Sequence, residues 1–195
     1  MLVLTLDNFK PMMENADFIM HIIRTDFFVT FGMYSIIYIV MAVFTKNPVV
    51  DRIDRNANKL ISFTGLVFLI SWIILIITNF VNISEPYRVE ILDSMFGKYW
   101  FGFWIQPFLW LTLTQLLRFE KIRKQKLVRF FFSILFITTI QQLIVISTSF
   151  RKDFPNPFIH FTTTEIVTGI TIKLFLFLTA VGIYYVIEKK LKKSN

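Results

Sequence analysis

Hydrophobic residues gather into five long runs that short polar segments separate. The runs cover residues 27–44, 60–81, 99–117, 127–147 and 166–187. Each is long enough for a helix with a rise of 1.5 Å per residue to cross roughly 30 Å of hydrocarbon. The sequence lacks the short segments of alternating apolar and polar residues that are typical of membrane β-strands. The pattern therefore predicts an all-α integral membrane protein, with a bundle of five transmembrane helices in residues 27–187.

The segments before and after these runs are too short to form a soluble domain. Within residues 1–26, Phe18, Ile19, Ile22 and Ile23 recur at helical spacing beside charged residues. This pattern predicts an N-terminal helix that lies in the membrane interface. Residues 188–195 form a basic tail, and the first 26 residues do not have the pattern of a cleavable signal peptide.

The distribution of Lys and Arg predicts the orientation of the chain. The larger group lies after the first run, between the third and fourth runs, and after the fifth: Lys46, Arg52, Arg55, Lys59, Arg118, Lys121, Arg123, Lys124, Lys126, Arg129, Lys189, Lys190, Lys192 and Lys193. The smaller group lies on the opposite side: Lys10, Arg24, Arg88, Lys98, Arg151 and Lys152. Because basic residues are in excess in cytoplasmic segments, we expect the N-terminus outside and the C-terminus in the cytoplasm. We place this multi-pass protein in a bacterial inner membrane.

The composition bears on which metal sites and partners the chain could have. Of the 195 residues, 55% are hydrophobic and 17% are charged, and there is no cysteine. The two histidines, His21 and His160, lie outside the apolar runs, so we expect no metal site in this chain. The net charge of +8 would suggest nucleic acid in a soluble protein. Here the basic residues flank apolar runs, where they attract anionic lipid, so we expect no nucleic-acid partner.

Lys173 is the only ionisable residue deep within an apolar run. A charged group in hydrocarbon is a functional candidate, because it is costly to bury unless it is paired or hydrated. Lys173 would serve as a proton-relay member, as the partner of a carboxylate or as a ligand for an anionic headgroup. The alternative is that it snorkels to the interface and serves no specific role.

Four amides in the third and fourth runs form a second polar set, namely Gln106, Gln115, Gln141 and Gln142. Amides in hydrocarbon need partners, so these side chains are expected to hydrogen-bond across helix interfaces. Lining a quinone pocket or a file of water molecules is the alternative. The aromatic residues that open the third run, Tyr99, Trp100, Phe103 and Trp104, indicate an interfacial belt or a platform for a quinone ring.

The turn between the third and fourth runs is the most basic segment of the chain. Its basic residues are Arg118, Lys121, Arg123, Lys124, Lys126 and Arg129. They are expected to set the topology and to contact anionic lipid headgroups. An acidic cytosolic partner is the alternative.

From residue 56 onward the chain resembles the second half of the NrfD-like family, the quinol-interacting membrane subunits of polysulfide reductase and alternative complex III. The similar segments, in chain order, are Tyr99-Trp100, Phe103-Trp104-Ile105, Gln115-Leu116-Leu117, Phe119-Glu120-Lys121-Ile122-Arg123, Ser133-Ile134, Ile144-Val145-Ile146, Thr148-Ser149 and Arg151-Lys152-Asp153-Phe154. The resemblance implies a respiratory membrane subunit. The chain departs from the family in having five apolar runs where members have eight to ten, and in having no carboxylate in residues 73–79. The resemblance therefore implies a quinol site that is lost or is borrowed from a partner.

These observations predict a non-catalytic or accessory subunit of an inner-membrane complex, respiratory and quinol-linked. Its partners would be membrane lipids and either other integral subunits or further copies of itself. No cofactor would be bound by this chain alone, although a quinone or lipid would be shared with partners. A small transporter or channel, with a polar path near Lys173 and Gln141 or Gln142, is the alternative. Known catalytic motifs are absent from the sequence, and an enzyme of lipid metabolism would lack the groups for acid–base work.

Overall fold

Every regular element that the structure describes is a helix. The computed structural model describes residues 17–45, 47–82, 85–98, 100–139 and 163–194. Three helices in these residues are long and apolar enough to cross a membrane, namely Asp17–Phe44, Pro48–Thr78 and Val167–Leu191. The prediction of an all-α chain with membrane-spanning helices is confirmed at this level.

The first helix is continuous from Asp17 to Phe44. Its middle part is a π-helix, η2 (Ile23–Phe28), which leads directly into α2 (Val29–Phe44). The end of the predicted interfacial segment and the first predicted span therefore form one helix. The rest of that segment, residues 1–16, lies outside the described residues.

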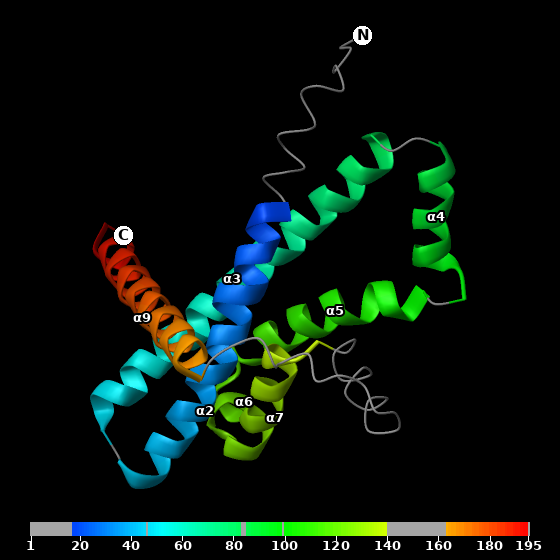
Figure 1. The fold of residues 1–195 in the computed structure, drawn as a ribbon. Helices are drawn as coiled ribbons and strands as arrows, with labels where there is room; N and C mark the ends of the chain where they lie inside the picture. The colour runs from blue at the N-terminus through cyan, green and yellow to red at the C-terminus, as the bar shows by residue number, and fades with distance from the viewer. Residues whose placement is uncertain (1–16, 46, 83–84, 99, 140–162, 195) are drawn as a thin grey trace.

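The second helix, α3 (Pro48–Asn82), begins well before the predicted start of the second span at residue 60. The Val49 amide donates to Asn47 Oδ1 at 2.9 Å, so Asn47 caps the helix, and Pro48 suits its first turn. Hydropathy marks the apolar part of a helix and not its ends, which explains the difference. As a result α2 and α3 form a hairpin, and charged residues that were predicted to lie in a loop are helical (Figure 1).

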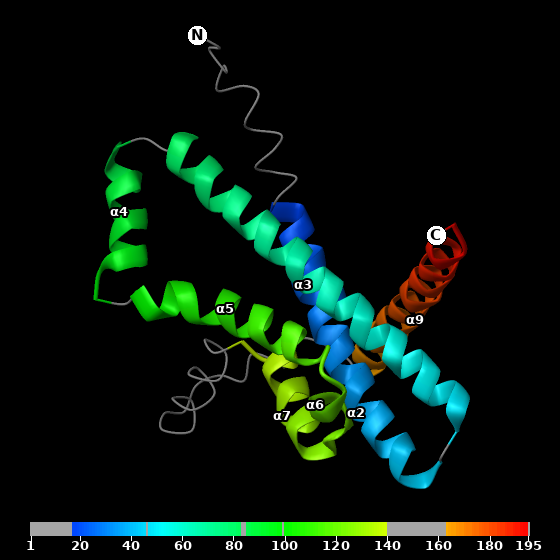
Figure 2. The same ribbon diagram turned by 180° about the vertical axis from the view of Figure 1, so that it is seen from behind.

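The middle of the chain forms four shorter helices, α4 (Glu85–Phe96), α5 (Trp100–Leu116), α6 (Glu120–Lys124) and α7 (Lys126–Ile137). In both ribbon views α4 stands away from the crossing of the long helices and is joined to α5 (Figure 2). The bounds of α5 agree with the third apolar run. The structure differs at the fourth run, because α7 ends at Ile137 and Thr138 is extended. Twelve residues of helix span only about 18 Å.

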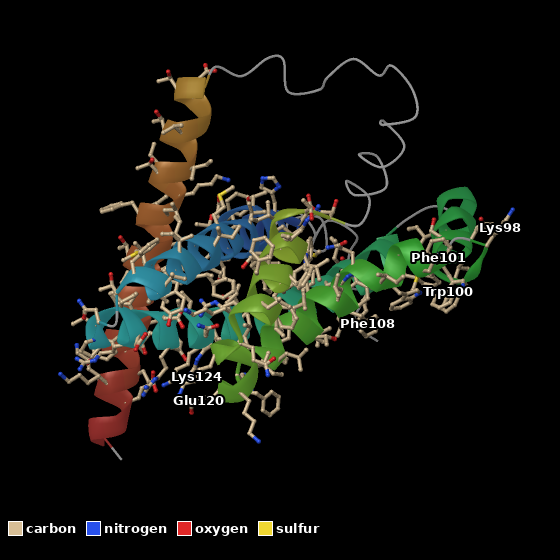
Figure 3. All side chains as sticks on the ribbon, turned by 90° about the horizontal axis from the view of Figure 1, so that it is seen from below. Lys98, Trp100, Phe101, Phe108, Glu120 and Lys124 are labelled. Atoms are coloured by element: carbon tan, nitrogen blue, oxygen red, sulfur yellow. The ribbon has the colours of Figure 1, made fainter. Side chains whose placement is uncertain are left out.

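The last helix, α9 (Thr163–Ser194), covers the fifth run and continues through residue 194 of the basic tail. It contacts η2, α2 and α3. Figure 3 shows that α9 crosses these helices steeply instead of lying parallel to them. The described long helices therefore pack as a stack in which α9 crosses the others at a steep angle.

Aromatic side chains form the centre of this stack. Phe28 of η2 is fully buried. Its ring lies 5.4 Å from that of Phe68, 5.3 Å from that of Trp110 and 5.6 Å from that of Phe136, measured between centroids. These residues belong to α3, α5 and α7, so one ring joins four helices, with packing geometries that favour aromatic pairs. Gly65 lets α3 approach α5, because an added Cβ would overlap the Thr114 side chain.

Candidate functional site

A row of polar side chains follows one buried face of α3. Asp54, Asn58 and Ser62 recur every four residues and are 3%, 1% and 1% exposed. The Asn58 Nδ2 group donates to the Asp54 carbonyl at 2.7 Å, and Ser62 Oγ lies 2.7 Å from the Thr114 carbonyl of α5. Residues four apart share a helical face, so Asp54, Asn58 and Ser62 all point inward while Asp51, Arg52 and Arg55 stay exposed.

Arg129 of α7 reaches this row and forms a two-point ion pair with Asp54. Its Nη1 donates to Asp54 Oδ2 at 2.8 Å, and its Nη2 pairs with the other carboxylate oxygen. The same guanidinium lies 3.2 and 3.3 Å from Ser35 Oγ of α2. The side chains of Arg129 and Asp54 are 2% and 4% exposed. One buried ion pair therefore joins α2, α3 and α7.

Two tyrosines of α2 complete the surroundings of this pair. The Tyr34 hydroxyl lies 3.5 Å from Asp54 Oδ1. The Tyr38 ring faces the Arg129 guanidinium at 4.4 Å, which is a cation–π distance, and its hydroxyl donates to Asp51 Oδ1 at 3.0 Å. The paired charges are thus enclosed by polar and aromatic groups, as a buried ion pair requires.

A polar cavity of about 290 Å³ lies beside the Asp54–Arg129 pair. Arg55, Arg123, Lys124 and Lys126 line it together with acidic side chains, among them Glu120. Lys124 lies 2.6 Å from Glu120, and this hydrogen bond lowers the pKa of the Glu120 carboxyl. The cavity combines positive charge with a wall of buried ionic groups, a setting that suits an anion.

The six basic residues of the turn were predicted as one lipid-facing group, and the structure divides them. Arg118, Lys121, Lys124 and Lys126 are exposed and Arg123 is half-buried. Arg129 does not fit the prediction, because its side chain is buried against Asp54. Sequence reasoning also missed Asp54. The available signal was that Arg129 lies inside an apolar run, between Val128 and Phe130.

Lys173 is paired with a carboxylate. Its Nζ lies 3.0 Å from Asp26 Oδ1 and 3.5 Å from the Thr25 carbonyl, so it links α9 to η2. The two side chains are 41% and 45% exposed. Of the roles proposed for Lys173, pairing with a carboxylate agrees best with this geometry.

The four amides have different positions. Gln115 donates to the Ser62 carbonyl at 3.0 Å and so links α5 to α3, as expected of an interface residue. Gln106 lines a cavity of about 570 Å³ with Arg24, Trp72 and Trp110 among its neighbours. Gln141 and Gln142 lie outside the described residues, so the structure does not bring them to Lys173.

The aromatic residues at the start of α5 pack against α4. Trp104 donates its indole N–H to the Met95 carbonyl at 2.7 Å, and its ring lies 5.3 Å from that of Trp72. Figure 3 shows Trp100, Phe101 and Phe108 at this end of the molecule, far from Glu120 and Lys124. Trp100 and Phe108 also line an open apolar cavity of about 610 Å³. Tyr99 lies outside the described residues.

In the described part of the chain, no three His, Cys, Asp or Glu side chains are placed to hold a metal ion. The buried carboxylate of Asp54 is bonded to a guanidinium instead.

Comparisons with known proteins do not assign the chain to a family. No protein-family model, curated protein or solved structure matches the chain. The resemblance to the NrfD-like family remains a prediction from the sequence.

Proposed function

We propose that the chain is an accessory integral subunit of a bacterial inner-membrane complex and has no catalytic activity of its own. The observation that carries this proposal is the pairing of ionisable groups between helices, Asp54 with Arg129 and Lys173 with Asp26. General acid–base catalysis needs a group that is available to exchange protons with a substrate. These pairs instead hold helices in register.

The topology that we propose has five membrane segments, with the N-terminus outside. Three of them are the long apolar helices, and the other two are α5 and the segment 127–147 that begins with α7. The basic residues of the α3 start, the α5–α7 turn and the α9 end support a cytoplasmic position for those three regions. Cysteine accessibility from the two membrane faces would test it, since the chain contains no native cysteine.

The exposed side of α9 is the surface that we assign to a partner subunit. In its apolar segment only 11% of the residues are buried within the chain. Phe175 and Leu176 are 69% and 59% exposed on it. Lipid or neighbouring helices must cover such a surface, and an accessory subunit would present it to the complex.

A quinol link is supported by the cavity that Gln106 lines. The guanidinium of Arg24 lies 5.5 Å from the Trp110 ring centroid beside it, so the cavity combines rings with polar groups. A volume of about 570 Å³ falls within the range of small-molecule sites. A quinone or lipid shared with partners would fit this chemistry.

The deciding experiment is purification of the tagged chain from native membranes in mild detergent, with mass spectrometry of the partners and an optical spectrum. Recovery with haem and iron–sulfur subunits would support the proposal, whereas a lone monomer would overturn it. Phe175→Ala should reduce partner recovery. The matched control is Phe119→Ala, because Phe119 is 61% exposed but lies in the turn before α6.

A small transporter or channel is the second candidate, and the Lys173–Asp26 pair favours it. This pair is half-exposed and joins two helices that are long and apolar enough to cross a membrane, so it would line a polar path. Lys173→Met should then abolish flux in proteoliposomes while expression stays normal, and Lys121→Met should have no effect. Unchanged flux in the Lys173 variant would exclude this path.

A further inference from the structure

A second cavity, with a mixed polar and apolar lining, lies at the charged start of α3, on the side that faces α9. Its volume is about 420 Å³. Arg55, Asn58 and Phe63 of α3 line it, with Arg118 and Arg123 from the α5–α7 turn and Tyr184 from α9. Arg55 and Arg123 also line the cavity beside Asp54, so the two spaces share a wall.

Three guanidinium groups give this cavity its charge. Arg55, Arg118 and Arg123 form no ion pair with a carboxylate among the described residues. Lys59 and the carboxylate of Glu188 also line the cavity, and they pair with each other at 2.6 Å. Guanidinium groups bind phosphate oxygens through paired hydrogen bonds, so this cluster of three suits a phosphate group.

The buried side chain of Asn58 is a second feature that a ligand of this cavity would have to match. This side chain is 1% exposed, and its Oδ1 atom is buried with no hydrogen-bond partner in the structure. Its Nδ2 is bound to the Asp54 carbonyl, and this bond fixes which end of the amide is left unpaired. A buried carbonyl oxygen without a donor is destabilising, so a ligand hydroxyl would be favoured here.

We propose that this cavity binds a phosphate ester that carries a free hydroxyl group. The guanidinium groups hold the phosphate, and the hydroxyl donates to Asn58 Oδ1. Phe63, which lines the cavity and is 54% exposed, offers an apolar surface that a lipid acyl chain would contact. The ester is therefore a glycerophospholipid headgroup or a soluble phosphate ester with the same groups. This site does not depend on the proposed partner subunits.

The first test compares two lipids on the unmodified full chain in phosphatidylcholine nanodiscs. Phosphatidylglycerol and phosphatidylmethanol carry the same charge, but the second has no free hydroxyl. Native mass spectrometry should show about fivefold stronger retention of phosphatidylglycerol, the contribution of one hydrogen bond. Equal retention of the two lipids would overturn the proposal without any variant being made.

Single substitutions test what each residue contributes to lipid retention. Arg123→Gln should weaken phosphatidylglycerol retention about tenfold, because it removes a charged hydrogen bond. Lys121→Gln is the matched control, since Lys121 lies on the same short helix and does not line the cavity. Asn58→Leu should keep anion binding and remove the preference for phosphatidylglycerol over phosphatidylmethanol. Equal losses for the two charge variants would show diffuse attraction and overturn the site.

A competition assay distinguishes a lipid headgroup from a soluble phosphate ester as the ligand. Glycerol 1-phosphate is added to nanodiscs that hold bound phosphatidylglycerol. Displacement assigns the cavity to a soluble ester, and persistence of the lipid assigns it to the headgroup. Either result supports the shared chemistry when the Arg123→Gln variant loses the same ligand, and binding that is insensitive to that variant contradicts it.

Discussion

Two ion pairs join distant helices of this molecule in different surroundings. The side chains of Arg129 and Asp54 are 2% and 4% exposed, whereas those of Lys173 and Asp26 are 41% and 45% exposed. Burial removes water from both charges and makes each depend on the other. Asp26 lies at the N-terminal end of the first apolar run, where interfacial water is an alternative partner for a half-exposed pair, so the two members are more nearly independent. Exposure, more than the type of charge, therefore decides what an ion pair contributes to the stability of the fold.

The largest effect should come from breaking the buried pair. Arg129→Met leaves Asp54 without its partner in a site that excludes water, and it should lower the free energy of unfolding by about 3 to 5 kcal/mol. Unfolding in detergent micelles, followed by circular dichroism, measures this loss. A loss below about 1 kcal/mol would show that Asp54 finds another partner, and the comparison would fail.

Replacing both members of the buried pair should be much less harmful. In Asp54→Leu with Arg129→Met neither charge is left alone, so most of the stability lost in the single variant should return. The same unfolding assay gives the coupling energy from a double-mutant cycle. Additive losses would mean that the two residues act through separate contacts, such as those of Arg129 with Ser35.

The half-exposed pair should have a smaller influence on stability. Lys173→Met should change the free energy of unfolding by less than about 1 kcal/mol, because interfacial water can replace the lost contact with Asp26 at the N-terminal end of the apolar run. High salt should weaken the Lys173–Asp26 pair and leave the buried pair almost unaffected. A loss as large as that of Arg129→Met would show that exposure does not separate the two pairs.

The smallest effect should come from the ion pair between Glu120 and Lys124, which is more exposed than the other two pairs. The pKa of Glu120 is lowered by the hydrogen bond from Lys124, so this contact stabilises the folded chain above the ordinary pKa of glutamate. The contribution is lost as pH falls through the lowered pKa. Lys124→Ala should raise the Glu120 pKa toward its ordinary value in an NMR titration, with no resolved change in unfolding. An unchanged pKa would mean that Arg123 and Arg55 dominate.

The apolar runs predicted where most helices lie, because hydrocarbon demands continuous stretches of apolar side chains. The third run agrees with α5, and the fifth lies within α9. The runs did not predict where helices begin and end. α3 begins at Pro48 because Asn47 caps it, and α7 ends at Ile137 within an apolar run. Those bounds depend on backbone hydrogen bonds that hydropathy does not measure.

The candidate site was predicted less well than the fold. Lys173 stood out because it is a lone charge in an apolar run, and Gln115 because an amide there needs a partner. Their partners, Asp26 and the Ser62 carbonyl, belong to other helices and lie 147 and 53 residues away in sequence. No local pattern contains such a pairing.

The length and composition of each apolar run are enough to predict a helical chain that is apolar enough for a membrane. Which charges are buried depends on the tertiary structure. Asp54 and Arg129 lie at opposite ends of a long stretch of sequence, and each alone resembles a solvated or lipid-facing residue. They become a buried pair because α2, α3 and α7 pack together, and the geometry of that packing arises only when the helices meet.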